Sequence, residues 1–119
     1  MRESARQRLR KSSDFARVRT DGRKAECGVF SVQICLRTPD EQPPLRRFGV
    51  IASRRIGGAV QRNRAKRLMR EVFRARREVL PESCDVVIVA RARIFDFPLE
   101  TLEKRFTGAA NKLRQQLKA

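Results

Sequence analysis

Positively charged side chains gather in one segment of the sequence, between residues 54 and 77. This segment contains ten arginine and lysine residues, and Glu71 is its one acidic residue. At the 100° per residue of an α-helix, five of these basic residues and one amide fall within an arc of about 100°. They are Lys66, Arg67, Arg70, Arg74 and Arg77, together with Asn63. Guanidinium groups form bidentate contacts with phosphate oxygens, so the segment predicts a surface that binds a polyanion.

An apolar stripe on the opposite side of the same predicted helix would anchor it to the rest of the fold. The stripe consists of Ala65, Leu68, Met69, Val72, Ala75 and Val79. A solvated helix face is the plain alternative for the charged side. Such a face mixes signs, whereas this one repeats like charges three and four residues apart, which is destabilising without a partner. We therefore favour nucleic-acid binding.

The residues that lead into this helix also favour contact with a nucleic-acid backbone. Arg54 and Arg55 precede the Gly57-Gly58 turn, where the absence of side chains allows close approach. The first turn of a helix leaves free N–H donors, and Arg62 and Arg64 point to the two flanks of the charged arc.

The chain lacks the side chains that most enzymes use for acid–base, nucleophilic or metal chemistry. It has no histidine, and the spacing of Cys27, Cys35 and Cys84 fits neither a zinc site nor a disulfide framework. Its carboxylates are scattered, with Asp85 alone at a strand start and Asp40-Glu41 in a proline-rich loop. We expect no cofactor or metal on the protein, and reduced cysteines in a cytoplasmic protein.

Length and composition predict one folded domain with a polyanionic partner. The 119 residues carry a formal net charge of +16, and their 40% hydrophobic content is too high for a disordered basic tail. No apolar run approaches the roughly 18 residues that span a bilayer, so we expect no membrane partner. We assign residues 1–119 to a single RNA-binding domain in which residues 1–11 form a basic N-terminal arm.

Hydrophobic periodicity predicts an α+β fold, a sheet with helices packed on it. The predicted elements, in order, are a helix capped by Ser12, Ser13 or Asp14, strands over 27–37 and 46–53, a helix over 60–77, a strand over 84–90 buried on both faces, and a helix after Pro98. The first strand is expected to be half-buried, with Phe30, Val32, Ile34 and Leu36 facing the core. Gly49 marks a bulge or a close backbone approach in the second strand.

The phenylalanines divide between core packing and a functional role. Phe30, Phe48, Phe73 and Phe106 favour the core, since each lies in a predicted element. Phe15, Phe95 and Phe97 fit either role.

Residues 54–74 resemble the signature of the protein component of bacterial ribonuclease P. The signature is a Gly-x-Ala-Val turn followed by Arg-Asn-Arg and a Lys-Arg pair in a basic helix, here residues 57–60, 62–64 and 66–67. Further matches are Arg10-Lys11, Asp14-Phe15, Phe48-Gly49-Val50, Ser53 and Ala90-Arg91. The resemblance covers nearly the whole chain.

This resemblance implies both a fold and a function. The fold is a four-stranded mixed sheet of the ribosomal-protein-S5-domain-2 type in the order αβββαβα, with a further strand near residues 23–26 and a left-handed βαβ crossover, which is rare. The function is to bind a catalytic RNA and the 5′ leader of precursor tRNA, and so to assist removal of the leader. The RNA would supply the active site and hold Mg²⁺, and the protein alone would be non-catalytic.

Two sets of site residues follow. The set that binds the RNA subunit is Arg54, Arg55, Arg62, Asn63, Arg64, Lys66, Arg67, Arg70 and Arg74. The set that binds the leader is Phe15, Arg19, Gln33, Arg91 and Arg93. Arg19 and Gln33 stand where the family often has aromatic residues, and Ala92 stands where it often has a second basic residue. Arg19 can replace a base stack with a phosphate contact or a guanidinium stack.

Two other functions share this composition, namely a small basic ribosomal protein that binds ribosomal RNA and a duplex DNA-binding protein. A ribosomal protein more often has long basic extensions, and here only residues 1–11 resemble one. A DNA-binding protein of this size needs base-reading side chains presented by a dimer, and the sequence shows no dimer-interface signal. The Arg-Asn-Arg helix with its glycine turn favours the ribonuclease P subunit.

Overall fold

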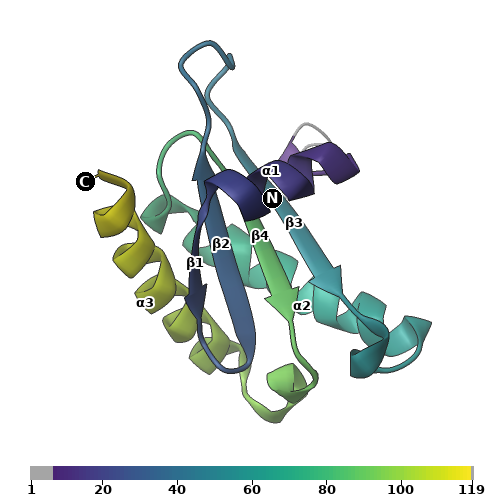
Figure 1. The fold of residues 1–119 in the computed structure, drawn as a ribbon. Helices are drawn as coiled ribbons and strands as arrows, with labels where there is room; N and C mark the ends of the chain where they lie inside the picture. Colours follow the sequence, from purple (N-terminus) through teal and green to yellow (C-terminus); the bar gives the residue numbers. More distant parts are fainter. Residues whose placement is uncertain (1–6, 119) are drawn as a thin grey trace.

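The computed structural model describes residues 7–118 and has three α-helices around one four-stranded sheet (Figure 1). In chain order the elements are α1 (Ser12–Asp21), β1 (Arg23–Glu26), β2 (Phe30–Leu36), β3 (Arg46–Ala52), α2 (Ala59–Arg76), β4 (Cys84–Ala90) and α3 (Leu99–Lys118). Short 3₁₀ turns, η2 (Arg54–Ile56), η3 (Arg77–Val79) and η4 (Ala92–Asp96), lie between them. The order αβββαβα and the strand near residues 23–26 are both confirmed.

The sheet is mixed, and its strand order is β1-β2-β4-β3. β2 pairs antiparallel with β1 and with β4, whereas β3 pairs parallel with β4. In Figure 1 both parallel strands point downward, α2 passes behind the sheet, and the chain moves from β3 on the right to β4 on its left. This is a left-handed crossover, as the resemblance implied and against the usual right-handed rule.

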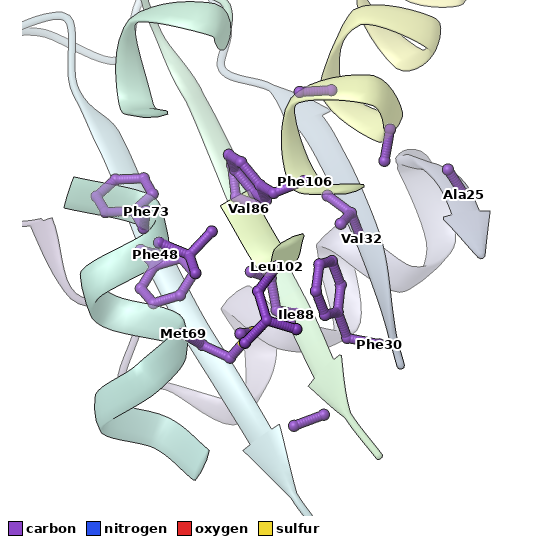
Figure 2. Close-up of a cluster of buried hydrophobic side chains, with 14 of the residues drawn as sticks. Ala25, Phe30, Val32, Phe48, Met69, Phe73, Val86, Ile88, Leu102 and Phe106 are labelled. Carbon is purple, nitrogen blue, oxygen red and sulfur yellow. The ribbon is translucent and has the colours of Figure 1, made fainter. Parts of the chain in front are cut away.

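The main core lies between the sheet and the helices α2 and α3, which cover one face (Figures 1 and 2). Phe48 of β3 stacks on Phe73 of α2 with ring centroids 4.5 Å apart. Phe30 and Phe106 are fully buried from β2 and α3. The core assignment of these four phenylalanines is confirmed.

The buried face of α2 is turned by part of a helical turn relative to the predicted stripe. Phe73 is fully buried, because its ring fills the space over Phe48, while Ala75 is exposed and Leu68 only half-buried. This rotation brings Lys66 and Arg70 closer to the buried face, and both are half-buried.

The other face of the sheet carries α1 and a smaller apolar cluster, formed by Leu9, Val18, Cys35 and Val87. β2 is therefore covered on both faces over much of its length, and its prediction as a half-buried strand was wrong because α1 was not placed over it. The end of the strand differs too, since Leu36 was predicted to face the core and is 42% exposed.

Ion pairs fasten α1 to this face. Asp85 is fully buried, and its carboxylate accepts two hydrogen bonds of 2.8 Å from the guanidinium of Arg47. Arg47 also donates to Asp14 of α1 at 3.4 Å. The predicted N-cap role of Ser12, Ser13 or Asp14 was wrong, because the helix begins after Lys11 and has no side-chain cap. Asp14 instead links the first turn to the sheet.

The N-terminal arm is packed against the sheet where the structure describes it. Arg8 forms a parallel bridge with Phe48, and the Leu9 N–H donates to the Phe48 carbonyl at 2.9 Å. Leu9 is only 6% exposed, so residues 8 and 9 extend the sheet at the open edge of β3. The arm was predicted over 1–11, and residues 1–6 lie outside the described residues.

A second ion pair joins α1 to the loop between β2 and β3. Arg17 donates to both Glu41 oxygens at 2.9 and 2.8 Å, and the Thr38 N–H donates to the same carboxylate at 2.8 Å. The hydrogen bonds from Arg17 and Thr38 lower the pKa of Glu41 from 4.5 to about 2. A carboxyl group whose pKa is lowered by folding stabilises the fold above its unfolded pKa and loses that contribution on acidification.

We predict that Glu41→Gln changes how stability depends on pH. The wild-type protein should lose the Glu41 contribution as the pH falls from 4.5 to about 2, whereas the variant should be less stable at neutral pH and lose less in that window. Urea unfolding at a series of pH values measures both effects. Asp40→Asn, an exposed neighbour in the same loop, is the control and should follow the wild type. Parallel curves for Glu41→Gln and wild type would contradict the prediction.

Candidate nucleic-acid interface

The basic residues of α2 form a ridge along the outer side of the helix. Asn63, Arg64 and Arg67 are exposed, and the other predicted members on the helix are half-buried, namely Arg62, Lys66, Arg70 and Arg74. Among residues 7–118, no ion pair joins Arg62, Lys66, Arg67 or Arg70 to a carboxylate. The ridge thus keeps its positive charge for an external partner.

The entry to α2 leaves backbone donors open beside two further arginines. Arg54 and Arg55 are exposed in η2, and the Ser53 hydroxyl accepts the Arg55 N–H at 3.3 Å. Gly57 has a φ of 142°, which only glycine adopts readily, and Gly58 precedes the helix without a side-chain cap. Val60 is 80% exposed in the first turn. A phosphate group can therefore approach the N–H groups of this turn closely.

Two aromatic rings hold three arginines where α2 and α3 begin. The Arg64 guanidinium lies over the Phe95 ring, 5.2 Å from its centroid. Arg93 and Arg105 both contact the Phe97 ring, at 5.7 and 4.9 Å. Both phenylalanines are half-buried and pack against the main core, so each combines core packing with orientation of a cation.

Two residues of the predicted site sets, Arg64 and Arg93, belong to this cluster of rings and arginines. Arg64 of the RNA-subunit set is oriented by Phe95, and Arg93 of the leader set lies at the ring that Arg105 also contacts. Sequence reasoning missed Arg105, which also donates to the Cys27 carbonyl at 2.8 Å. No sequence pattern singled it out, because its contacts with Phe97 and Cys27 come from the fold. The role of Arg93 in leader binding stays a prediction.

Four other members of the leader set lie on α1 or on the side of the sheet that α1 covers, spread from the last turn of α1 to the end of β4. Phe15 lies half-buried on α1, where a Cβ at Gly49 would come within 2.6 Å of its ring. Gly49 was predicted to mark a bulge or a close backbone approach; the register with β4 runs through it without a bulge, and the group that approaches it is the Phe15 ring rather than backbone. Arg19 is exposed in the last turn of α1. Gln33 of β2 is half-buried, and strand alternation puts it on the same face as Cys35 under α1. Arg91 follows β4 and is exposed.

Arg91 is held by a carboxylate that sequence reasoning missed. Its Nη2 donates to both Glu26 oxygens at 2.8 and 2.7 Å, and the Lys24 ammonium lies 3.3 Å from one of them. Partial burial raises the pKa of Glu26, but the hydrogen bonds from Arg91 and Lys24 outweigh it, so the pKa lies below its ordinary value. No hydrophobic alternation identified β1, where Glu26 lies, so its contact with Arg91 could not be predicted.

The structure also brings the two predicted sets close to each other. Parallel strands β3 and β4 end at the same edge of the sheet, and a cavity of about 470 Å³ opens there between Arg55 and Arg91, with Val89 and Ile56 in its wall. One arginine belongs to each set. A nucleic acid on the ridge and a second strand on the α1 face would therefore meet at this edge.

Residues 7–118 contain no cluster of metal-ligating side chains and no activated thiol. No three histidine, cysteine or carboxylate side chains in this range come together as a metal site would require. Burial raises the pKa of the Cys84 thiol to about 12, and it also raises the pKa values of Cys27 and Cys35. The three free thiols are therefore poor nucleophiles. No helix in the same range is long and apolar enough to cross a membrane.

A family model and the sequences of known proteins point to the same family. A family model described as Ribonuclease P matches residues 4–114. The ribonuclease P protein component of Desulfovibrio desulfuricans is 41% identical over 85 residues, which are 71% of this chain and 63% of that protein. The protein of the same name from Pelotomaculum thermopropionicum is 35% identical over 96 residues, 81% of this chain and 82% of that one.

Solved structures show the same similarity. The RNase P protein from Thermotoga maritima superposes with a TM-score of 0.75 at 26% identity, and covers 88% of this chain and 96% of its own. The Staphylococcus aureus RNase P protein gives a TM-score of 0.72 at 26% identity, over 87% of this chain and 91% of that one.

We predict that Glu26→Gln strengthens binding of single-stranded RNA. The substitution releases Arg91 and removes a negative charge that repels phosphate, so affinity for a short oligoribonucleotide should rise roughly two- to fivefold, as expected for an exposed ion pair. Fluorescence anisotropy at constant ionic strength measures the affinity. Glu100→Gln on α3 changes the net charge equally and should have a much smaller effect. An equal rise in both variants would show that only net charge matters.

Proposed function

Because the chain belongs to the family of bacterial ribonuclease P protein components, we propose that it binds the catalytic RNA of ribonuclease P through the α2 ridge and the 5′ leader of precursor tRNA through the α1 face. A ribosomal protein is not favoured, since the relatives named above are ribonuclease P proteins. The protein would help the RNA remove the leader and leave a mature tRNA 5′ end.

The observation that carries this proposal is the charge of Arg62, Lys66, Arg67 and Arg70, which form no ion pair within residues 7–118. They lie on a helix whose opposite side is buried through Phe73 and Met69, so the helix that carries them is fixed before a partner arrives. Arg64 is further oriented by the Phe95 ring. Arginines presented along a fixed helix match the phosphate backbone of a folded RNA without reading its sequence.

The α1 face suits a single strand better than a duplex. Phe15 offers part of an aromatic ring, and Arg19, Gln33 and Arg91 supply hydrogen-bond donors around it. Unpaired bases stack on aromatic rings or guanidinium planes, and only the precursor carries an unpaired leader. We assign Phe15, Arg19, Gln33 and Arg91 to leader contact on this basis, and Arg93 to either strand at the Phe97 ring.

The chemistry of cleavage is assigned to the RNA. Two carboxylates on the α1 side of the sheet each accept two hydrogen bonds from an arginine, Asp85 from Arg47 and Glu26 from Arg91. A carboxylate in such a pair is neutralised as a metal ligand and as a base, so these two do not fit a Mg²⁺ site, and no three candidate ligands come together elsewhere in residues 7–118. We propose that the RNA holds the Mg²⁺ ions and that the holoenzyme works in the cytoplasm.

We predict that the purified protein alone does not cleave precursor tRNA, with or without Mg²⁺. The carboxylates near the proposed leader site are paired with arginine and provide neither a metal site nor a general base. Gel electrophoresis of an end-labelled precursor measures cleavage, and the same preparation with added catalytic RNA is the positive control. Site-specific cleavage at the 5′ end by RNA-free protein would contradict the prediction.

We predict that Arg64→Ala and Arg67→Ala each weaken assembly with the catalytic RNA by about 1–3 kcal/mol, the range of a well-formed charge-assisted contact. Both side chains are exposed, so melting temperatures should stay close to wild type. Filter binding or anisotropy with the RNA measures assembly. Arg114→Ala on α3 removes the same charge from a helix without predicted contacts to the RNA subunit. The ridge is not the interface if all three variants weaken binding equally.

A further inference from the structure

A further basic surface lies where α2 and α3 begin, near the lower end of the molecule in Figure 1. Its three cations are Arg64 on α2, Arg93 in η4 and Arg105 on α3, and all three side chains are exposed. Arg64 lies over the ring of Phe95, and the other two contact the ring of Phe97. This aromatic–arginine cluster therefore extends exposed positive charge from the α2 ridge to α3.

The charge of the aromatic–arginine cluster is largely uncompensated. Within residues 7–118, no carboxylate forms an ion pair with Arg64 or Arg105. The Asp96 carboxylate lies 3.9 Å from Arg93, but these two side chains are 64% and 70% exposed, and such a pair contributes little. The cluster therefore keeps its positive charge for an external anion.

The Arg105 guanidinium is held by an aromatic ring, a carbonyl and a glycine turn. It lies 4.9 Å from the centroid of the Phe97 ring, and its Nη1 donates to the Cys27 carbonyl at 2.8 Å. Gly28, in the turn between β1 and β2, has a φ of 83°, and a Cβ there would lie 3.5 Å from the same nitrogen. A guanidinium has several N–H donors, so one bond to a carbonyl leaves the others for a ligand.

The two rings of the cluster are fixed by the core. Phe95 and Phe97 are half-buried, and both pack against the main core between the sheet and the long helices. A guanidinium over an aromatic face keeps the N–H groups at its edge, where they can bind phosphate oxygens. Because the rings do not move, the arginines that they hold lose less conformational entropy when phosphate binds.

We propose that Arg64, Arg93 and Arg105 together bind a segment of the phosphate backbone of the catalytic RNA. The rings of Phe95 and Phe97 are the positioning groups that hold the three guanidinium groups for it. The inference rests on the proposed function for the identity of the RNA, and it extends the contact from α2 to α3. The catalytic RNA is the partner because the cluster begins on the α2 ridge, and α2 and α3 cover the face of the sheet opposite α1.

Assembly with the catalytic RNA, measured over a series of salt concentrations, tests the role of Arg105. Arg105→Ala should weaken assembly roughly tenfold, as expected for the loss of one charge-assisted contact. The slope of log affinity against log salt should become shallower by about 0.7–0.9, the change for one phosphate contact. Lys104→Ala is the matched control, since it removes a charge from the preceding residue of α3, whose ammonium lies 3.7 Å from Glu100. It should change affinity less than about twofold.

A double-mutant cycle tests whether Phe95 acts through Arg64. Phe95→Leu keeps an apolar side chain but removes the ring, so it should weaken assembly roughly two- to fivefold, the range of a cation–π contact. The same change in an Arg64→Ala background should cause no further loss, because the cation that the ring holds is absent.

The second ring is tested by loss and rescue. Phe97→Leu should weaken assembly to a similar extent as Phe95→Leu, and Phe97→Tyr, which keeps a ring, should stay within about twofold of wild type. Melting curves establish that each variant is folded. Arg105→Ala changes an exposed side chain, so it keeps the test valid if a ring variant is unstable.

The outcomes separate this inference from the proposed function. Equal effects of Arg105→Ala and Lys104→Ala would overturn the cluster as a binding surface, and a full effect of Phe95→Leu in the Arg64→Ala background would overturn the positioning role. If Arg105→Ala weakened the holoenzyme's binding of precursor relative to mature tRNA and left assembly unchanged, the catalytic RNA would not be the partner. Wild-type assembly of Arg67→Ala would contradict the proposed role of the ridge, and the comparison of Arg105→Ala with Lys104→Ala would stand independently.

Discussion

The buried Asp85 carboxylate is the contact on which the α1 face depends. Its two hydrogen bonds from Arg47 join β4 to β3, and Arg47 carries the link on to Asp14 in the first turn of α1. Leaving one charge of a buried pair without its partner costs about 3–5 kcal/mol, so the pair with Asp85 fixes the Arg47 side chain, and Arg47 presents a donor to Asp14 at one position of α1. Phe15 then lies over Gly49, where no side chain on the sheet intervenes.

The few carboxylates of this basic chain are distributed unevenly, and the distribution separates the surfaces. Arg17, Arg47, Arg76 and Arg91 are each paired with an acid, and these pairs join α1 to the loop after β2, β3 to β4, α2 to α3, and the end of β4 to β1. In the part of the chain that the structure describes, Arg62, Lys66, Arg67 and Arg70 of the α2 ridge have no such partners. Charge pairing thus stabilises the fold where elements meet and leaves the outer side of α2 with an excess of positive charge.

Features encoded in contiguous residues could be predicted from the sequence, and features that need distant segments could not. The periodicity of α2 and the apolar run of β4 identified those elements, and the ridge followed from spacing along one helix. β1 has four residues and one buried side chain, so it has no pattern of its own. The burial of Phe73 depends on its contact with Phe48. The position of Leu9 depends on the edge of β3, and the Glu26–Arg91 pair depends on β1. The functional roles of the individual site residues stay predictions.

The hand of the connection between β3 and β4 decides which side of the sheet is available to a ligand. The mirror-image route between the same two strands would carry α2 across the opposite side, over Gln33 and Val87, where α1 now lies. Both long helices share one side instead, and within residues 7–118 the other side is covered by a helix of ten residues and the short segment around Leu9. The uncommon chirality therefore gives the sheet two different sides. One side is packed against two long helices and forms the main hydrophobic core, and the other is covered by less of the chain and leaves polar side chains of the strands accessible to solvent.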